Sequence, residues 1–207
     1  MTAALPPSCG SLPDKATLRQ ELRAALRLLT PSERLARSSK LCEHLLRTPA
    51  LVRAQRVALY RAMGQEASLE PLIPVLRDAG VALWLPRVRD DQSLDFLPWP
   101  ADAPLAPGPF GILEPVVAGQ PARAGEIDCF LVPGLAFDRQ GGRLGRGKGY
   151  YDRALSLFPD SVPRVGVAFA LQLLPEVPCE SWDLRMHTLV SEVGVLDCVP
   201  ASLLGSA

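Results

Sequence analysis

A glycine-rich segment in the C-terminal half of the sequence carries a cluster of positive charges. Residues 138–152 read Asp-Arg-Gln-Gly-Gly-Arg-Leu-Gly-Arg-Gly-Lys-Gly-Tyr-Tyr-Asp, with five glycines and four cations. Glycines let the backbone approach a ligand closely, and the N–H groups of a glycine-rich turn bind phosphate. Arginine and lysine neutralise such a ligand. We therefore predict an anion site in residues 143–152, the glycine loop, built from Arg143, Arg146, Lys148 and the glycines at positions 145, 147 and 149.

Two common nucleotide motifs nearly match the glycine loop, and both fail. Gly142 to Lys148 satisfies the first part of G-x-x-x-x-G-K-[S/T], but Gly149 follows where a Ser or Thr should reach Mg²⁺. The dinucleotide pattern G-x-G-x-x-G, started at Gly145, lacks its third glycine because position 150 is Tyr150. A solvated basic loop is the structural alternative. It explains the charge, but not the two tyrosines and the aspartate that end the loop.

The glycine loop lies between a predicted strand and a predicted helix. Residues 129–137 form a nearly unbroken apolar run, which is typical of a strand buried on both faces, and a helical pattern follows at residues 150–158. In an open α/β sheet, ligands bind beyond the carboxyl ends of the strands. The order of strand, glycine loop and helix therefore suits an anion site at that edge of the sheet.

The rest of the sequence alternates helices and strands. Apolar residues recur at helical spacing after Asp14, and the Thr-Pro-Ser-Glu sequence at residues 30–33 is a capping box that starts a second helix, which continues to Leu45. A helix at residues 69–79 is closed by Gly80. This order predicts an α/β domain with a mainly parallel sheet. The predicted strands are residues 57–62, 81–86, 94–99, 165–170 and 188–195, and residues 98–125 are predicted to be irregular.

Length, charge and cysteine content limit the possible functions. At 207 residues the chain can bury its own core, and we predict a single domain at residues 14–207 after a flexible tail at residues 1–13. The 22 basic and 22 acidic residues give a net charge of zero, which argues against nucleic acid or a membrane surface as a partner. No apolar stretch approaches the roughly 18 residues of a membrane span. With five scattered cysteines, we expect a cytoplasmic monomer with reduced thiols.

The glycine loop and the strand before it resemble the signature of the 5-formyltetrahydrofolate cyclo-ligase family, P-G-x-x-F-D-x-x-G-x-R-L-G-x-G-x-G-Y-Y-D. The chain matches this pattern at Pro133-Gly134, at Phe137-Asp138, at Gly141 and from Arg143 through Asp152. Weaker matches are K-x-x-L-R at residues 15–19 and the runs at residues 61–66, 85–87 and 111–115. The resemblance covers residues 15–196.

This resemblance implies a fold and a reaction. The fold is a three-layer α/β/α arrangement with a mainly parallel sheet, of the NagB/RpiA-like type. The reaction converts 5-formyltetrahydrofolate, with or without further glutamyl residues on its tail, into 5,10-methenyltetrahydrofolate. It consumes ATP with Mg²⁺ and releases ADP and phosphate. Phosphorylation turns the formyl oxygen into a leaving group, and N10 of the folate then attacks within the same molecule.

The resemblance also assigns roles to residues of this chain. Arg143, Arg146 and Lys148 are the catalytic candidates, because phosphoryl transfer needs cations around the phosphates. Asp152 and Asp183 match the metal positions, and Mg²⁺ prefers carboxylates. The residues assigned to the nucleotide are Lys15, Ala16, Thr17, Leu18, Arg19, Arg143, Leu144, Gly145, Arg146, Gly147, Lys148, Gly149, Tyr150 and Tyr151. Those assigned to the folate are Arg61, Glu66, Arg146, Gly147, Lys148, Gly149 and Tyr150, with Phe110 as a candidate for stacking or for core packing.

Two other functions remain open on the sequence alone. An ATP-dependent phosphotransferase acting on another small substrate could use the same glycine loop. A non-catalytic folate or nucleotide binder is also compatible, although such a protein is expected to lose part of the set Arg143, Lys148, Asp152 and Asp183, which this chain retains. The family often has His before the last of these aspartates, where this chain has Trp182.

Overall fold

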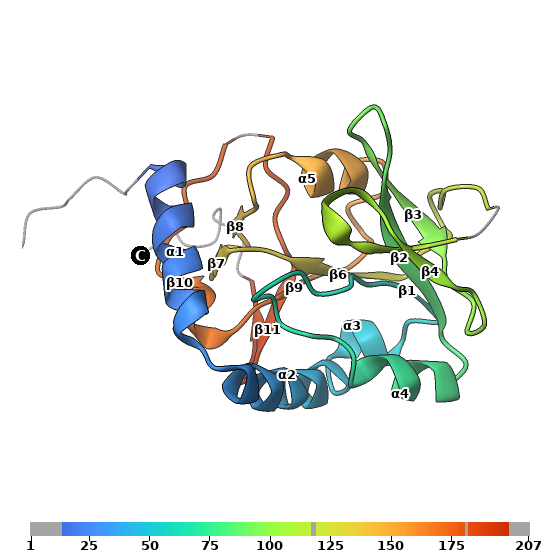
Figure 1. Cartoon of the computed structure of the whole chain (residues 1–207), viewed down its shortest axis with the longest axis horizontal. Coiled ribbons are helices and arrows are strands. Elements are labelled where there is room, and N and C mark those ends of the chain that lie inside the picture. Colours follow the sequence, from blue (N-terminus) through green and yellow to red (C-terminus); the bar gives the residue numbers. More distant parts are fainter. Residues whose placement is uncertain (1–13, 117–118, 181, 199–207) are drawn as a thin grey trace, which may run out of the picture.

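The computed structural model describes residues 14–116, 119–180 and 182–198, which fold around a seven-stranded sheet (Figure 1). The predicted N-terminal tail lies outside the described residues. The strand order is β12-β11-β9-β6-β1-β2-β3. In that order the strands are β12 (Gly194–Asp197), β11 (Thr188–Ser191), β9 (Arg164–Val167), β6 (Cys129–Pro133), β1 (Arg56–Ala58), β2 (Ala82–Val88) and β3 (Leu94–Pro98).

The centre of this sheet is parallel and both of its edges are antiparallel. β1 pairs in parallel with β2 and β6, and β9 pairs in parallel with β6 and β11. β12 and β3 complete the edges as antiparallel partners of β11 and β2. Val57, Leu131, Val165 and Val190, one from each of four central strands, are buried. The predicted α/β fold with a mainly parallel sheet is confirmed.

Helices cover both faces of the large sheet (Figure 1). α2 (Pro31–Leu45), α3 (Pro49–Val52) and α4 (Leu72–Asp78) lie below it in that view, and α5 (Tyr150–Leu155) lies above it. On the lower face, apolar side chains of α2 and α4 join one core with those of β1 and β6. On the upper face, the rings of Phe130 and Phe158 meet edge to face, with 4.8 Å between their centroids. These cores hold three layers together.

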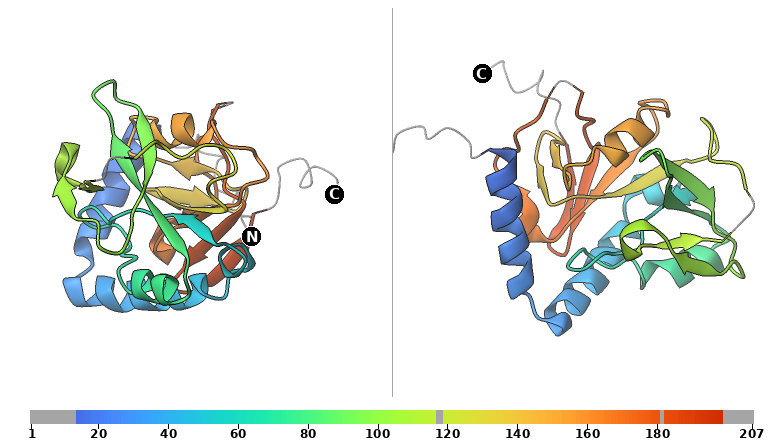
Figure 2. Two further views of the ribbon diagram at one scale, coloured as in Figure 1. Left: turned by 90° about the vertical axis from the view of Figure 1, so that its right-hand side faces the viewer. Right: turned by 45° about the horizontal axis from the view of Figure 1, so that its top comes forward.

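The helix α1 (Lys15–Leu28) stands at one end of the molecule and meets α2 at an angle (Figure 2). Its apolar stripe of Leu18, Leu22 and Leu26 is buried. Asp14 caps the helix, because its carboxylate accepts hydrogen bonds from the first N–H groups. Within the residues described, every helix is too short or too polar to cross a bilayer.

The capping box predicted for the second helix is confirmed. The Glu33 N–H donates to Thr30 Oγ1 at 3.2 Å, and the Thr30 N–H donates to Glu33 Oε2 at 2.8 Å. Pro31 occupies the first helical position, where the backbone needs no N–H donor. Two N–H groups that a helix start leaves unpaired are thus satisfied locally, so α2 begins at the residue that the sequence indicates.

The predicted single strand at residues 129–137 is wrong. The chain leaves the large sheet after β6 and continues as β7 (Ala136–Asp138) in a separate sheet of order β10-β7-β8. Gly134 lies in the break, where a Cβ would come 2.6 Å from the Phe137 ring, so the turn admits no side chain. β8 (Arg143–Leu144) and β10 (Leu173–Leu174) complete the small sheet. The glycine loop is therefore attached to this small sheet.

Other element boundaries also differ from prediction. The predicted last strand at residues 188–195 is a hairpin of β11 and β12, and the predicted helix at residues 69–79 covers only residues 72–78. Residues 98–125 are not wholly irregular. They contain an antiparallel pair of β4 (Leu105–Pro107) and β5 (Leu113–Pro115). Short strands with proline at an edge carry a weak alternation signal, which explains why this pair was missed.

Candidate active site

A cavity of about 310 Å³ opens where β1 and β6 end, next to the glycine loop. This is the edge of the sheet at which the sequence predicted an anion site. Ten of the predicted site residues line it: Arg61, Glu66, Arg143, Gly145, Arg146, Lys148, Gly149, Tyr150, Tyr151 and Asp152. Predicted residues from two separate stretches of sequence, 61–66 and 143–152, thus meet in one cavity, which we call the reaction cavity.

A buried aspartate shapes the turn that leads into the glycine loop. Asp138 Oδ1 accepts hydrogen bonds from the N–H groups of Gln140 and Gly142 at 2.8 and 2.9 Å. Its Oδ2 accepts a third bond, from the Val177 N–H at 2.8 Å. Only 2% of Asp138 is exposed, so these bonds replace water around its carboxylate. The aspartate in the Phe-Asp part of the motif therefore has a structural role.

The end of the glycine loop requires a residue without a side chain. Gly149 adopts φ 64° and caps the start of α5, a left-handed conformation that favours glycine. A Cβ there would also come 2.9 Å from Arg153 Nη1. The Arg153 guanidinium donates to the Lys148 carbonyl at 3.0 Å and lies 5.6 Å from the centre of the Tyr150 ring. Arg153, which the sequence did not single out, thus holds the loop against its helix.

Arg143 and Asp152, the first and last residues of the glycine loop, form a largely buried ion pair. Arg143 Nη2 lies 2.8 Å from Asp152 Oδ2, and only 5% of the arginine side chain is exposed. Arg143 Nη1 donates to the Pro133 carbonyl at 3.4 Å, whereas Nε has no hydrogen-bond partner among the described residues. The guanidinium also lies 5.6 Å from the centre of the Tyr151 ring. Arg143 is thus a fixed positive charge with unused donor capacity.

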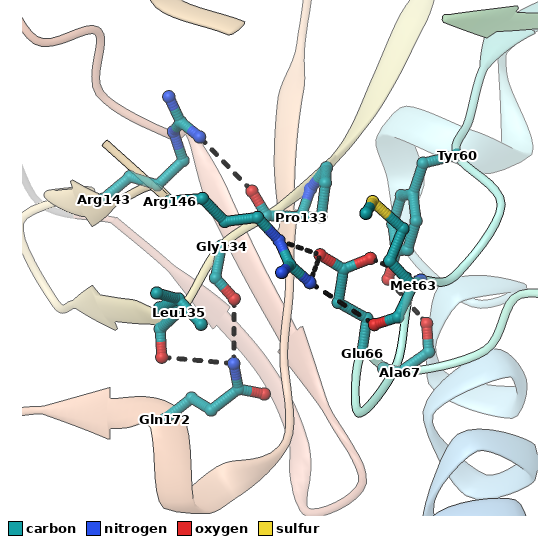
Figure 3. A network of polar contacts seen from close by, with 10 residues as sticks. All are labelled: Tyr60, Met63, Glu66, Ala67, Pro133, Gly134, Leu135, Arg143, Arg146 and Gln172. Carbon is teal, nitrogen blue, oxygen red and sulfur yellow. Dashed lines mark hydrogen bonds and ion pairs between the residues drawn. The ribbon is translucent and has the colours of Figure 1, made fainter. Parts of the chain in front are cut away.

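Arg146 and Glu66 form a second ion pair at the cavity wall (Figure 3). Arg146 Nη2 and Nε donate to Glu66 Oε1 at 2.8 and 3.0 Å. The other carboxylate oxygen accepts from the Met63 N–H at 2.8 Å. Only 12% of the glutamate side chain is exposed, against 43% of the arginine side chain. Two residues predicted to bind ligands therefore neutralise each other in this conformation.

The first turns of α1 reach the glycine loop from outside the cavity. Arg19 Nε donates to the Gly145 carbonyl at 2.9 Å, and Lys15 Nζ lies 2.9 Å from Asp183 Oδ2. The N–H groups of Ala16 and Thr17 donate to the capping aspartate. The side chains of Leu18 and Leu144 are in the core, so only the backbone of these two residues is open to a ligand. None of these residues, nor Gly147, lines the reaction cavity.

The pKa values of Lys15 and Asp183 reflect their pairing. Burial by itself raises the pKa of Asp183, but hydrogen bonds from Lys15 and from the Glu180 N–H bring it below its ordinary value. Burial likewise lowers the pKa of Lys15, but the carboxylates of Asp183 and Glu180 raise it above the ordinary value. The nearby charge of Arg143 also lowers the pKa of Asp183. Both side chains are therefore charged near neutral pH.

The two predicted metal ligands fit a metal that arrives with phosphate. Among the described residues no three His, Cys, Asp or Glu side chains gather into a metal-binding group. Asp152 and Asp183 are instead each paired with a cation, and Arg143 acts electrostatically on both. Mg²⁺ commonly takes one or two protein carboxylates and completes its shell with phosphate and water. The donor set therefore suits Mg²⁺ bound together with a nucleotide.

The buried tyrosines of the site are not candidate bases. Burial and the negative charge of Glu66 raise the pKa of both Tyr60 and Tyr151 well above the usual tyrosine value. The Tyr60 hydroxyl donates to the Ala67 carbonyl at 2.8 Å. Both residues stay protonated, and Tyr60 contributes a hydrogen bond whereas the ring of Tyr151 contributes shape.

Several lining residues received no role from the sequence. Glu114 is 8% exposed, and its Oε1 accepts from the Val88 N–H at 3.0 Å, so it fastens β5 to β2 beside the cavity. Most of the others fall within runs that already matched the family signature, which was the available signal. The side chain of Phe110 is not among those described. The unassigned lining residues are Tyr60, Met63, Pro86, Val88, Leu94, Ile112, Glu114, Pro133 and Gly134.

Comparisons with known proteins identify similar sequences and a similar structure. Residues 11–192 match the model of the 5-formyltetrahydrofolate cyclo-ligase family. A 5-formyltetrahydrofolate cyclo-ligase of Mycolicibacterium smegmatis is 36% identical over 151 residues, covering 70% of this chain and 78% of that protein. The mouse enzyme of the same name is 29% identical over 189 residues, covering 86% and 93%. The solution structure of Aquifex aeolicus 5,10-methenyltetrahydrofolate synthetase superimposes with a TM-score of 0.79 at 35% identity, covering 89% of this chain and 92% of that one.

Proposed function

The chain belongs to the 5-formyltetrahydrofolate cyclo-ligase family, and we propose that it converts 5-formyltetrahydrofolate and ATP into 5,10-methenyltetrahydrofolate, ADP and phosphate. One observation carries the proposal for this chain. Lys148 and Arg143, which suit phosphate, and Glu66, which suits a pterin, line the same cavity. A cavity of about 310 Å³ with apolar walls and a few convergent polar groups is typical of a small-molecule site.

The reaction needs a better leaving group on the formyl carbon. The formyl group on N5 is an amide, so its oxygen does not leave by itself. Transfer of the terminal phosphoryl group of ATP to that oxygen creates a phosphate leaving group. The lone pair of N10 then forms the new C–N bond, the C–O bond breaks, phosphate leaves and N10 loses its proton. Because the attack is intramolecular, the protein mainly has to orient the folate and neutralise charge.

The glycine loop contains one cation that is held in place, Arg143, and one whose side chain is exposed, Lys148. Arg143 is held by Asp152 and the Pro133 carbonyl, so it supplies a preorganised positive charge. Lys148 is exposed, and it forms no salt bridge among the described residues. We assign Lys148 to the transferring phosphoryl group, because a flexible ammonium can follow the charge as it moves.

Folate binding requires a change of partner at Glu66. A carboxylate can accept hydrogen bonds from the amino group and the ring N–H of a pterin, but one oxygen of Glu66 is occupied by Arg146. We propose that Arg146 turns from Glu66 toward the phosphates when both substrates bind. Arg61, which lies 3.2 Å from Glu70 and near the Trp99 ring, also lines the cavity, and we assign it to the rest of the folate.

We further propose that Asp152 and Asp183 hold Mg²⁺ with the nucleotide. The metal, when bound, supplies charge neutralisation between the phosphate oxygens. Lys15, which pairs with Asp183 here, is then available to the phosphates, whereas Arg143 keeps its position and acts on them through its charge. The first turn of α1, residues 15–19, contributes to the nucleotide site through Lys15 and Arg19.

Three finer expectations also belong to this proposal. The enzyme accepts folates with additional glutamyl residues, because the reaction cavity is open to the surface and the tail can extend out of it. It acts as a monomer, since one chain supplies the whole lining of the cavity. It works in the cytoplasm, where its buried free thiols Cys42 and Cys129 stay reduced.

The decisive experiment mixes purified protein with Mg-ATP and 5-formyltetrahydrofolate and follows methenyltetrahydrofolate by absorbance. We expect product to form only when all three components are present. Folded protein that binds folate without forming product would be a non-catalytic binder. ATP turnover that 5-formyltetrahydrofolate does not change would identify a phosphotransferase for another substrate. Either result contradicts the proposed function.

A further inference from the structure

A second cavity of about 300 Å³ lies against the reaction cavity. The two cavities share Glu66, Arg146 and Gly134, so the Arg146–Glu66 ion pair stands in the wall between them. Figure 3 shows this pair on one side of Gly134, with Gln172 on the other. Arg23 and Arg27 of α1 also line the second cavity. Nothing in the proposed reaction uses these two arginines.

The charge of the second cavity is positive. It is lined by the guanidinium-bearing residues Arg23, Arg27 and Arg146 and by one acid, Glu66. Both oxygens of that acid are already engaged, one by Arg146 and one by the Met63 N–H. Within the described residues, Arg23 and Arg27 form neither an ion pair nor a side-chain hydrogen bond. The cavity therefore offers unused donors and no free carboxylate.

The two arginines continue a row of cations along α1. Lys15, Arg19, Arg23 and Arg27 follow one another at intervals of four residues, which places them along one side of the helix over roughly 18 Å. Like charges at this spacing destabilise a helix. Lys15 offsets the repulsion with two acids, and Arg19 donates to the Gly145 carbonyl. The side chains of Arg23 and Arg27 have no acid or carbonyl partner within the described part of the chain.

The floor of the second cavity is rigid. Gln172 is 2% exposed, and its Nε2 donates to the carbonyls of Gly134 and Leu135 at 2.8 and 3.2 Å. Its Oε1 accepts from the Phe169 N–H at 2.8 Å. These bonds fix the break between β6 and β7, which forms a wall of both cavities. A fixed floor next to exposed arginines suits a group that binds through its charge.

We propose that the second cavity binds an anionic oxygen group, a carboxylate or a phosphate, next to the reaction cavity. Guanidinium groups bind both of these groups through paired hydrogen bonds. Two sources can supply the group: the glutamyl carboxylates of a folate whose pterin lies in the reaction cavity, and the phosphate released there. The first source rests on the proposed function, whereas the second can be tested by direct binding.

The test compares wild type with an Arg23→Gln/Arg27→Gln double variant. Glutamine keeps part of the aliphatic stem and removes the charge. Arg53→Gln is the matched control, because Arg53 is exposed and precedes the amino end of β1, away from both cavities. The substrates are 5-formyltetrahydrofolate and 5-formyltetrahydropteroyl amide, which keeps N10 but lacks the glutamate. Calorimetry with inorganic phosphate at low ionic strength forms a separate arm.

If the folate tail is the anion, the double variant raises the KM for 5-formyltetrahydrofolate about tenfold and leaves the KM for the amide unchanged. If phosphate is the anion, both KM values stay constant, and the double variant loses one phosphate site. The proposal is overturned if the folded double variant matches wild type and Arg53→Gln in every arm. Should wild type make no product, tryptophan fluorescence reports folate binding without ATP, so the proposed function can fail while this test still gives an answer.

Discussion

Lys15 Nζ lies 2.9 Å from Asp183 Oδ2 and 3.2 Å from Glu180 Oε1, which joins the first helix to a segment more than 160 residues further along the chain. Lys15 was predicted to bind the nucleotide and Asp183 to bind the metal. In this conformation each has the other as its partner. We therefore expect binding of a metal nucleotide to replace this ion pair.

The first prediction concerns this replacement. Lys15→Met removes the cation that pairs with Asp183 and, on the proposed assignment, a contact to the phosphates. We expect the KM for ATP to rise about tenfold, while Mg²⁺ alone binds more tightly because the carboxylate is released. Tryptophan fluorescence measures the metal affinity, since Trp182 adjoins Asp183 and is 69% exposed. Lys40→Met, on the exposed face of α2, is the control, and equal constants in both variants would contradict the assignment.

The second prediction concerns Lys148, the exposed lysine of the glycine loop. Lys148→Ala is expected to lower kcat by about 10²- to 10³-fold, because a cation that neutralises developing charge contributes to the transition state. Its midpoint of thermal unfolding should equal that of wild type, since the side chain is exposed and packs against no core. Lys40→Ala serves as the control, because Lys15, Lys40 and Lys148 are the only lysines in the sequence. Turnover at the wild-type rate would remove Lys148 from the mechanism.

The third prediction compares alanine substitutions at two glycines. One substitution would cause backbone strain alone, and the other would cause backbone strain and a steric clash. Gly141 and Gly80 both adopt left-handed backbone, with φ 79° and 75°. A Cβ at Gly141 would lie 2.2 Å from the Met186 carbonyl oxygen, whereas a Cβ at Gly80 meets nothing within 4 Å. Gly80→Ala should cost about 1 kcal/mol of unfolding free energy and Gly141→Ala about 3 kcal/mol or more. Urea unfolding measures both, and equal costs would show that the turn at Gly141 relaxes freely.

The fourth prediction is a pH dependence of stability. The folded pKa of Asp183 is below its unfolded value of about 3.9. The Lys15–Asp183 pair therefore stabilises the fold above about pH 4, and this contribution is lost as the pH falls through the folded pKa. Between about pH 6 and pH 3, Asp183→Asn should lose less unfolding free energy than wild type. Parallel curves of unfolding free energy against pH would show that the pair adds nothing.

The sequence predicted the features that depend on neighbouring residues. The capping box at Thr30, the layered α/β order and the position of the glycine loop at the end of a buried strand all follow from local patterns. The break at Gly134 could not be predicted, because its cause is the ring of Phe137 folded back against it. An apolar run does not reveal that its two halves belong to different sheets.

The sequence also could not predict which site residues form ion pairs with each other. Glu66 and Arg146 are 80 positions apart, and each was predicted to contact a ligand rather than the other. Spacing along the chain carries no information on such a pair. The second cavity was missed for the same reason, since it joins α1 to the segments around residues 66, 134 and 172.

The contact of Lys15 in α1 with Glu180 and Asp183 has a consequence for the stage of translation at which the site can form. Lys15 is translated more than 160 residues before either of its acidic partners, Glu180 and Asp183. A nascent chain that stops before Glu180 has its first helix without either acid. On the proposed assignment, we therefore expect the chain to bind a metal nucleotide only after Asp183 has been translated.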